Sequence, residues 1–495
     1  MPDLSQKNNV SSEIISAIFI IVFVSLFILS NFLTGFILSL YILLMGIGGI
    51  IAFFYPRSGI YAIIFLTFIF ERFFTLQSIF FSRAEYKLYP IDIIFLALIA
   101  GIIFQIAKKE ISVKLKRTDF LLIAFIFLGT IYFLISIVFW HGDFSLAFSS
   151  FKNYSFYSLF YFAILFLFQE RIYIKKLFQF AFAGAVSIIL FIIYGIAAGQ
   201  GLWSEFTPLS TEGVRLLAFT HAFYLSLVVL GGATYLLFKK TTNKIYFILL
   251  AIWIFGIIGS MMRHLWIGLA MSVALIYFLI AKDQKKIFKN ILIKFISAAI
   301  IILIIGGYFS LIFPKSEVNK IFVSAFNVLS QRTTSLLSVS GDESFFWRNV
   351  AWKESLKQYA ENPLLGIGFG KKIYIEIENY KDIVEVRNIH NSPLVILVQM
   401  GTVSFGIFVA FIFTGFRKIW RQKRGDWINM TLLILLFFYL TVFLFQPYLE
   451  TNLLGIFFWM LVGLIRSTKS PTYKSTRLDS QRVDARRANP LQIYK

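Results

Sequence analysis

The residues best suited to chemistry are a few histidines and arginines in otherwise apolar surroundings. His390 stands in the segment RNIHNSP, and Arg263 stands in GSMMRHLWIG between two apolar runs. A neutral imidazole accepts protons near neutral pH, and a guanidinium binds phosphate oxygens through paired hydrogen bonds. Together, these two groups would suit a reaction in which a hydroxyl loses its proton while a phosphate group leaves.

Each of these residues also has a simpler interpretation. The chain contains four histidines, and all fall at the edges of apolar runs or beyond them: His141, His221, His264 and His390. A single His or Arg at such an edge often anchors a helix at the membrane surface or pairs with an acid of a loop. Several arginines beside one His favour a site for an anionic ligand, and Arg215 and Arg348 are further candidates for it.

Composition identifies the class of protein that must position these residues. The 495 residues are 58% hydrophobic, 19% aromatic and only 15% charged, with 60 Phe, and the mean hydropathy is +0.79. Soluble domains carry about 25% charged residues, so a soluble globular protein is excluded and a membrane protein is predicted. Because the chain has no Cys, disulfides, thiolate nucleophiles and cysteine metal sites are excluded as well.

Apolar runs long enough to cross a bilayer recur along most of the chain. We place them near 14–32, 33–54, 59–74, 91–107, 120–139, 155–169, 178–198, 219–238, 245–261, 265–281, 292–312, 393–415, 428–446 and 449–465. They predict an all-α polytopic protein with about 14 transmembrane helices, although the runs at 59–74 and 155–169 are short for a crossing. The first run is too long for a signal peptide and leads directly into a second span.

The distribution of charge predicts the orientation. Most of the 47 Lys and Arg residues lie in the connectors or ends 108–117, 170–176, 239–244, 282–294, 416–424 and 466–495. An even number of spans places all of these segments on one side, which the positive-inside rule assigns to the cytoplasm together with both termini. The net charge of +22 is then an insertion signal rather than a nucleic-acid-binding surface. The basic tail is interpreted as solvated, with contact to anionic lipid as the alternative.

One loop on the opposite, extracytoplasmic side is far larger than the others. The predicted organisation is therefore about 11 membrane helices in 1–312, a loop of 313–392, about three helices in 393–465 and a tail of 466–495. A loop of that length should contain its own elements. Helical spacing of apolar residues between Val318 and Leu329 predicts a surface helix. A second helix is expected over 344–360 and should end before Pro363, followed by a glycine-rich bend in PLLGIGFG.

The motifs of this loop carry a family likeness. RNVAWKESLKQYAENPLLGIGFG, followed by HNSPLVILVQMGTVSFGIFV, resembles the O-antigen ligase and O-antigen polymerase superfamily. The hairpin IIGSMMRHLWIGLA is similar to the Ser-x-x-Arg hairpin of that family, which usually reads Ser-Arg-Gly where this chain has Met-Met-Arg-His. The motif-bearing part covers about 245–415, and the remaining helices match the family only in character.

This resemblance implies a GT-C-like glycosyltransferase with its active site at the outer face of a bacterial inner membrane. Such enzymes move a glycan from undecaprenyl diphosphate to an acceptor sugar hydroxyl, and in-line attack implies inversion at the anomeric carbon. The acceptor is lipid A–core for a ligase, which we favour, or a second carrier-linked glycan for a polymerase. The implied partners are these glycolipids and membrane lipid, with no nucleic acid, no cofactor and no metal.

The resemblance also assigns roles to individual residues. Arg263 and Arg348 match the diphosphate-binding arginines of the family, and His390 matches its proposed catalytic base. Two alternatives stay open for Asn391, which would orient the imidazole or hold a sugar hydroxyl, or would simply cap a helix. Trp352 would stack on the substrate or pack the loop helix onto the membrane helices. Further candidates for the phosphate site are Arg215 and Arg332.

Two other classes of function remain as rivals. A metal-dependent glycosyltransferase with an acidic pair in its first outer loop is disfavoured, because that turn reads SNFLTG and has no carboxylate. A flippase or other transporter for lipid-linked oligosaccharides would show internal repeats and charges deep in the membrane, and neither is evident in the sequence. A lateral cavity in which His390 and the arginines converge would separate an enzyme from a transporter.

Overall fold

The fold is taken from a computed structural model of the chain. The residues it describes are 4–69, 78–81, 84–87, 89–197, 217–240, 244–313, 315–316, 323, 326–327, 330, 334, 343–377, 380–423 and 426–468. Arg215, Arg332 and most of the surface helix expected between Val318 and Leu329 lie outside these residues.

Helices make up most of the described chain, as expected. In chain order, the elements before the large loop are α1 (Leu4–Thr34), α2 (Leu38–Phe54), α3 (Pro56–Ile69), β1 (Ser78–Phe81), β2 (Ala84–Lys87), α5 (Pro90–Ala107), α6 (Arg117–Val138), α7 (Phe144–Phe151), the π-helix η1 (Lys152–Phe156), α8 (Leu159–Leu167), α9 (Arg171–Ala197), α10 (Phe219–Lys239), α11 (Lys244–Gly259), α12 (Arg263–Leu279) and α13 (Lys282–Ile312). They are followed by α15 (Glu343–Glu361), β3 (Lys372–Ile377), β4 (Tyr380–Glu385), the 3₁₀ turn η3 (Val386–Asn388), α16 (Ser392–Gln422), α17 (Trp427–Val442) and α18 (Asn452–Ser467).

Every apolar run singled out in the sequence contains a helix, because a helix satisfies its backbone hydrogen bonds internally in a medium without water. By length and composition, six stretches of the described helices suffice to cross a membrane: Val10–Asn31, Pro90–Ala107, Arg117–Val138, Arg171–Leu190, Phe219–Lys239 and Ser392–Gln422. The total of about 14 crossings stays a prediction. The run expected at 155–169 is the clearest difference, since α8 is only nine residues long and continues from α7 through the π-helix η1.

The structure adds two short antiparallel hairpins to the helices. β1 pairs with β2, and β3 pairs with β4 with Ile375 opposite Asp382. In β3 the buried Ile373 and Ile375 alternate with exposed residues, which is the period of a strand. The expected all-α class is confirmed, and the two short hairpins are a detail that was not predicted because the sequence was read for helical spans.

Basic residues near the predicted cytoplasmic connectors also stabilise the bundle. Arg466 donates two hydrogen bonds of 2.9 Å to the buried carboxylate of Asp119, which joins the end of α18 to the start of α6. Lys418 of α16 donates to three backbone carbonyls at the end of α18. These ends of the helices therefore meet at one place in the fold.

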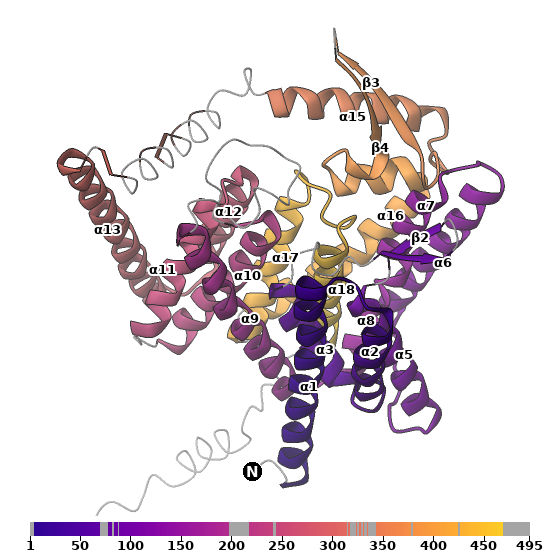
Figure 1. The fold of residues 1–495 in the computed structure, drawn as a ribbon, viewed down its shortest axis with the longest axis horizontal. Helices are drawn as coiled ribbons and strands as arrows, with labels where there is room; N and C mark the ends of the chain where they lie inside the picture. The colour runs from indigo at the N-terminus through magenta and orange to yellow at the C-terminus, as the bar shows by residue number, and fades with distance from the viewer. Residues whose placement is uncertain are drawn as a thin grey trace, which may run out of the picture.

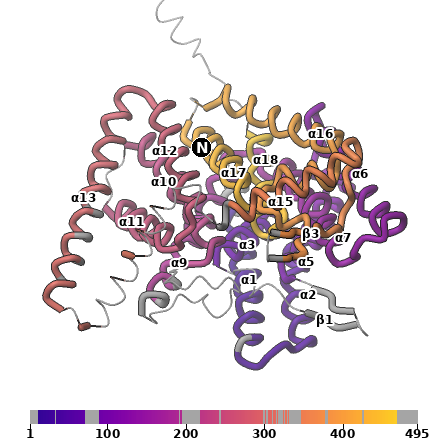
Figure 2. The backbone as a smooth tube through the Cα atoms, turned by 90° about the horizontal axis from the view of Figure 1, so that it is seen from above, coloured from indigo at the N-terminus to yellow at the C-terminus, as the bar shows by residue number. Residues whose placement is uncertain are grey.

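The large loop folds over one end of the helix bundle. Its expected helix is α15, which ends at Glu361, two residues before Pro363. In Figure 1, α15 and the hairpin of β3 and β4 lie together above α16. Figure 2 shows α13 at one edge of the molecule, α6 and α7 toward the other edge, and α17 and α18 between them.

Candidate functional site

α15 is fixed to the segment that precedes α16. The indole N–H of Trp352 donates a 2.7 Å hydrogen bond to the carbonyl of Ile389, one residue before His390. Near the end of α15, the hydroxyl of Tyr359 lies 2.6 Å from the hydroxyl of Thr402. Trp352 therefore packs the loop helix against the candidate site, which is the second of the two roles considered for it.

The glycine-rich bend after α15 docks into a break in α16. Gly401 has a φ of +70° and interrupts the helix, so nearby carbonyls of α16 become available. The N–H of Ile367 donates to the carbonyl of Val398 at 2.9 Å, and the N–H of Gly368 donates to that of Gln399 at 3.0 Å. A Cβ at Gly401 would lie 2.1 Å from the carbonyl oxygen of Leu364, so only glycine fits there. The bend predicted from PLLGIGFG is thus confirmed.

His390 sits at the junction of this loop with α16. Its φ of +57° is unusual for a residue with a side chain, and the imidazole is half-buried. The ring packs edge-on against the indole of Trp347 on α15, with 5.6 Å between the ring centroids and 78° between the planes. The oxygen of the Gln446 side chain lies 2.6 Å from Nδ1.

The contact with Gln446 assigns a tautomer to His390. An amide oxygen only accepts hydrogen bonds, so Nδ1–H must donate to it, which leaves Nε2 of the neutral ring as a proton acceptor. Burial and the nearby charge of Arg348 lower the pKa of His390, while the hydrogen bond with Gln446 acts in the opposite direction. The lowered pKa favours the neutral form of the His390 imidazole, which is the form that can accept a proton.

Gln446 is held in place by a connector that wraps around the start of α16. Ser392, the first residue of that helix, donates from its hydroxyl to the buried carboxylate of Glu450 at 2.5 Å. The same hydroxyl accepts a 3.1 Å hydrogen bond from the N–H of Leu449. The other carboxylate oxygen of Glu450 accepts from the hydroxyl of Tyr154 in η1. The connector between α17 and α18 is therefore a rigid support for the imidazole.

The start of α12 joins the same connector. Nε2 of His264 lies 2.8 Å from the hydroxyl of Tyr448, two residues after Gln446. The charges of Arg348 and Arg263 act on the imidazole of His264, and that of Arg348 also acts on the imidazole of His390. Arg348 of α15 thus acts on both histidines, His264 at the start of α12 and His390 before α16, and Arg263 directly precedes His264.

The remaining expected residues have other positions. Asn391 is the N-cap of α16, and its side-chain oxygen accepts a 3.0 Å hydrogen bond from the N–H of Leu394. The structure thus supports the capping role of Asn391, while Gln446 holds the imidazole. His221 is buried and contacts the carbonyl of Ile69 at 2.9 Å, which is a position inside the bundle.

Sequence reasoning missed Gln446, Tyr448 and Glu450. Their only signal was a short polar interruption, FQPYLE, between two apolar runs. In chemical terms, the site combines a neutral imidazole with a free proton-accepting nitrogen and two guanidinium groups nearby. It can remove a proton from a hydroxyl while it stabilises negative charge on a leaving group.

A comparison with protein families bears on this site. Residues 245–409 match the family model described as O-antigen ligase. The matched segment runs from α11 into α16 and contains Arg263, Arg348 and His390. No curated protein matches the chain.

Proposed function

We propose, on the premise that residues 245–409 belong to the O-antigen ligase family, that the protein is a membrane glycosyltransferase of the ligase type. It transfers a glycan from undecaprenyl diphosphate to a sugar hydroxyl of lipid A–core at the outer face of a bacterial inner membrane. The basic connectors support this orientation, with both termini in the cytoplasm. The observation that carries the proposal is the imidazole of His390, which contacts Gln446 and Trp347 and on which the charge of Arg348 acts, with Arg263 in the same matched segment.

The proposed reaction is a single displacement. The acceptor hydroxyl gives its proton to Nε2 of His390 while its oxygen bonds to the anomeric carbon. The bond between that carbon and the diphosphate oxygen breaks, and its electron pair leaves with the diphosphate. Arg263 and Arg348 stabilise the negative charge that develops there. Attack opposite the leaving group inverts the configuration of the anomeric carbon.

The sequence motifs fit a ligase and a polymerase equally well. The two enzymes differ in the acceptor that they use, so the acceptor must be identified by experiment. Purified protein would be incubated with a carrier-linked repeat unit, with and without lipid A–core, and the products separated by size. A ligase forms the lipid A–core conjugate and leaves the carrier-linked glycan unextended when lipid A–core is omitted. Chain extension without lipid A–core would instead identify a polymerase that joins carrier-linked repeat units.

The contact between Gln446 and His390 predicts a specific pH dependence. A general base must be neutral, so activity falls as the pH drops through the pKa of His390. Because that pKa is lowered, the acid limb of kcat/KM should lie below pH 6.5, the ordinary value for His. Gln446→Glu places a carboxylate beside Nδ1, which stabilises the imidazolium and should move the limb upward by about one unit or more.

Asn388→Asp is the matched control for Gln446→Glu. Asn388 is exposed and lies two residues before His390, so the variant adds the same charge nearby but in solvent. Its acid limb should move much less, because water screens exposed charges. Equal shifts in both variants, or no shift in Gln446→Glu, would show that Gln446 does not hold the imidazole.

A further inference from the structure

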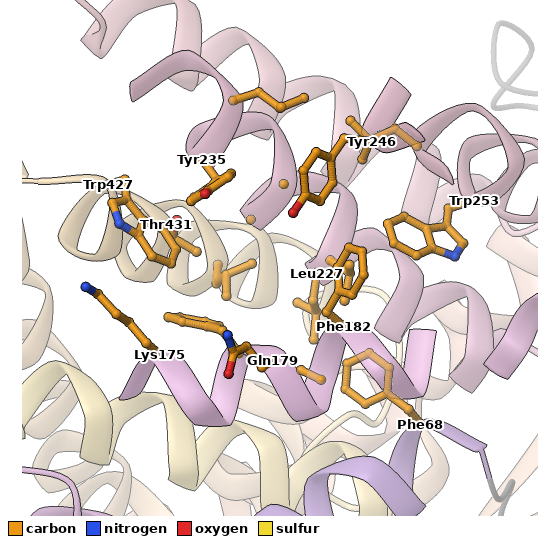
Figure 3. Close-up of a pocket in the computed structure, with 18 of the residues that line it drawn as sticks. Phe68, Lys175, Gln179, Phe182, Leu227, Tyr235, Tyr246, Trp253, Trp427 and Thr431 are labelled. Carbon is orange, nitrogen blue, oxygen red and sulfur yellow. The ribbon is translucent and has the colours of Figure 1, made fainter. Parts of the chain in front are cut away.

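A cavity lies outside the candidate site, between α9, α10, α11 and α17. Its volume is about 580 Å³. Figure 3 shows Lys175 and Gln179 of α9 on one side, facing Trp427 and Thr431 of α17 and Tyr235 of α10. Lys175, Lys239 and Trp427 lie near the helix ends that adjoin the predicted cytoplasmic connectors.

The lining divides into an apolar body and a basic end. Toward the middle of the bundle, the cavity is lined by Phe182, Leu227, Trp253, Leu435 and Phe457. Every charged residue in the lining is a lysine, Lys175 or Lys239, and both are exposed. Along α10, the 12 residues between Leu227 and Lys239 correspond to about 18 Å, so the cavity is elongated along the helices.

Local packing keeps this space open. Gly231 and Gly232 line the cavity from α10, and a Cβ at Gly231 would lie 3.5 Å from Cγ2 of Thr431. The ring of Trp427 packs edge-on against Tyr235, with 5.1 Å between the ring centroids. The indole N–H of Trp253 donates to the carbonyl of Ala185 at 3.0 Å. These contacts hold the aromatic side chains of the lining in place, so the side chains do not fill the cavity.

We propose that this cavity binds a phospholipid with an anionic headgroup. An elongated apolar space suits an acyl chain, and two ammonium groups at its end complement a negatively charged phosphate headgroup. Asp426, which neighbours Trp427, is already paired with Arg171, so its charge does not neutralise the two lysines. Lys175 and Lys239 bind the headgroup, and one acyl chain lies along Phe182 toward Trp253.

Two pairs of variants test this site. Ala181→Phe places a large ring into the lining, and Ala183→Phe places the same ring on an exposed position of the same helix outside it. Lys175→Gln with Lys239→Gln removes both charges of the lining. Lys176→Gln with Lys244→Gln removes the same charge from residues nearby that do not line the cavity.

Binding would be measured by native mass spectrometry of the full chain in detergent, titrated with dioleoyl phosphatidylglycerol, dioleoyl phosphatidylcholine or sodium phosphate. The wild type and both controls should retain one tightly bound phosphatidylglycerol and bind phosphatidylcholine more weakly. The double lysine variant should bind phosphatidylglycerol on the order of tenfold more weakly, and Ala181→Phe should lose the tight site. Sodium phosphate should not compete, because it lacks the acyl chain.

Lys175 and Lys239 are exposed, so their double variant keeps the test valid if Ala181→Phe does not fold. Equal affinity for phosphatidylglycerol and phosphatidylcholine would overturn the proposal. Loss of binding in the control pair equal to that in the Lys175 and Lys239 pair would overturn it too, since this would indicate general attraction to a basic surface. The measurement needs no glycan substrate, so its outcome is independent of the proposed enzyme activity.

Discussion

Replacing His390 with Asn is expected to reduce glycan transfer by about 10²–10⁴-fold, the usual contribution of a general base. Asn cannot accept the acceptor proton as imidazole does, but it tolerates the left-handed backbone of this position, where φ is +57°. His390→Ala should lose the same activity, with some added destabilisation because Ala is disfavoured at positive φ. The measurement is kcat for transfer from a carrier-linked glycan, with thermal unfolding of each variant in detergent.

His141→Ala is the matched control for His390. His141 also has a positive φ, of 47°, and it is exposed beyond α6, so the backbone effect is similar while the candidate site is untouched. Its activity should stay near that of the wild type.

The His390→Asn protein itself should still bind the glycan donor, because Arg263 and Arg348 are intact. Near-normal turnover of a folded His390→Asn protein would remove this residue as the base.

The sequence was sufficient to predict the helices and to single out candidate residues for chemistry. A bilayer forces each spanning segment to be apolar and helical, so the runs are visible without any knowledge of tertiary contacts. The position of α15 followed from the residues before Pro363. The candidates Arg263, Arg348 and His390 were noticed because charged and titratable groups are costly near a membrane unless they have partners.

The contacts that support the site could not be predicted in the same way. Gln446 contacts His390 from a connector two helices away, and no periodicity marks such a pairing. The break in α16 at Gly401 depends on the close approach of Leu364, which is a tertiary feature. The π-helix η1, from which Tyr154 reaches Glu450, lies where the sequence suggested only a loop and the start of a short span.

Replacing Arg348 with Gln is expected to lower kcat by about 10²–10³-fold, the usual effect of removing one donor that stabilises developing negative charge. The variant has a second signature that a merely structural residue would not show. The charge of Arg348 helps to lower the pKa of His390, so its removal should raise that pKa and move the acid limb of kcat/KM upward. Lys353→Gln removes an exposed positive charge from the same helix and should change neither quantity substantially.

Arg263→Gln should lower kcat over the same range of about 10²–10³-fold if both arginines bind one diphosphate. The double variant then gives the sharpest test, because two groups that act on the same leaving group are coupled. Its loss should differ from the product of the two single losses, and Arg→Lys at either position should restore part of the rate through the charge alone. Independent, multiplicative effects would mean that the two arginines act on different groups.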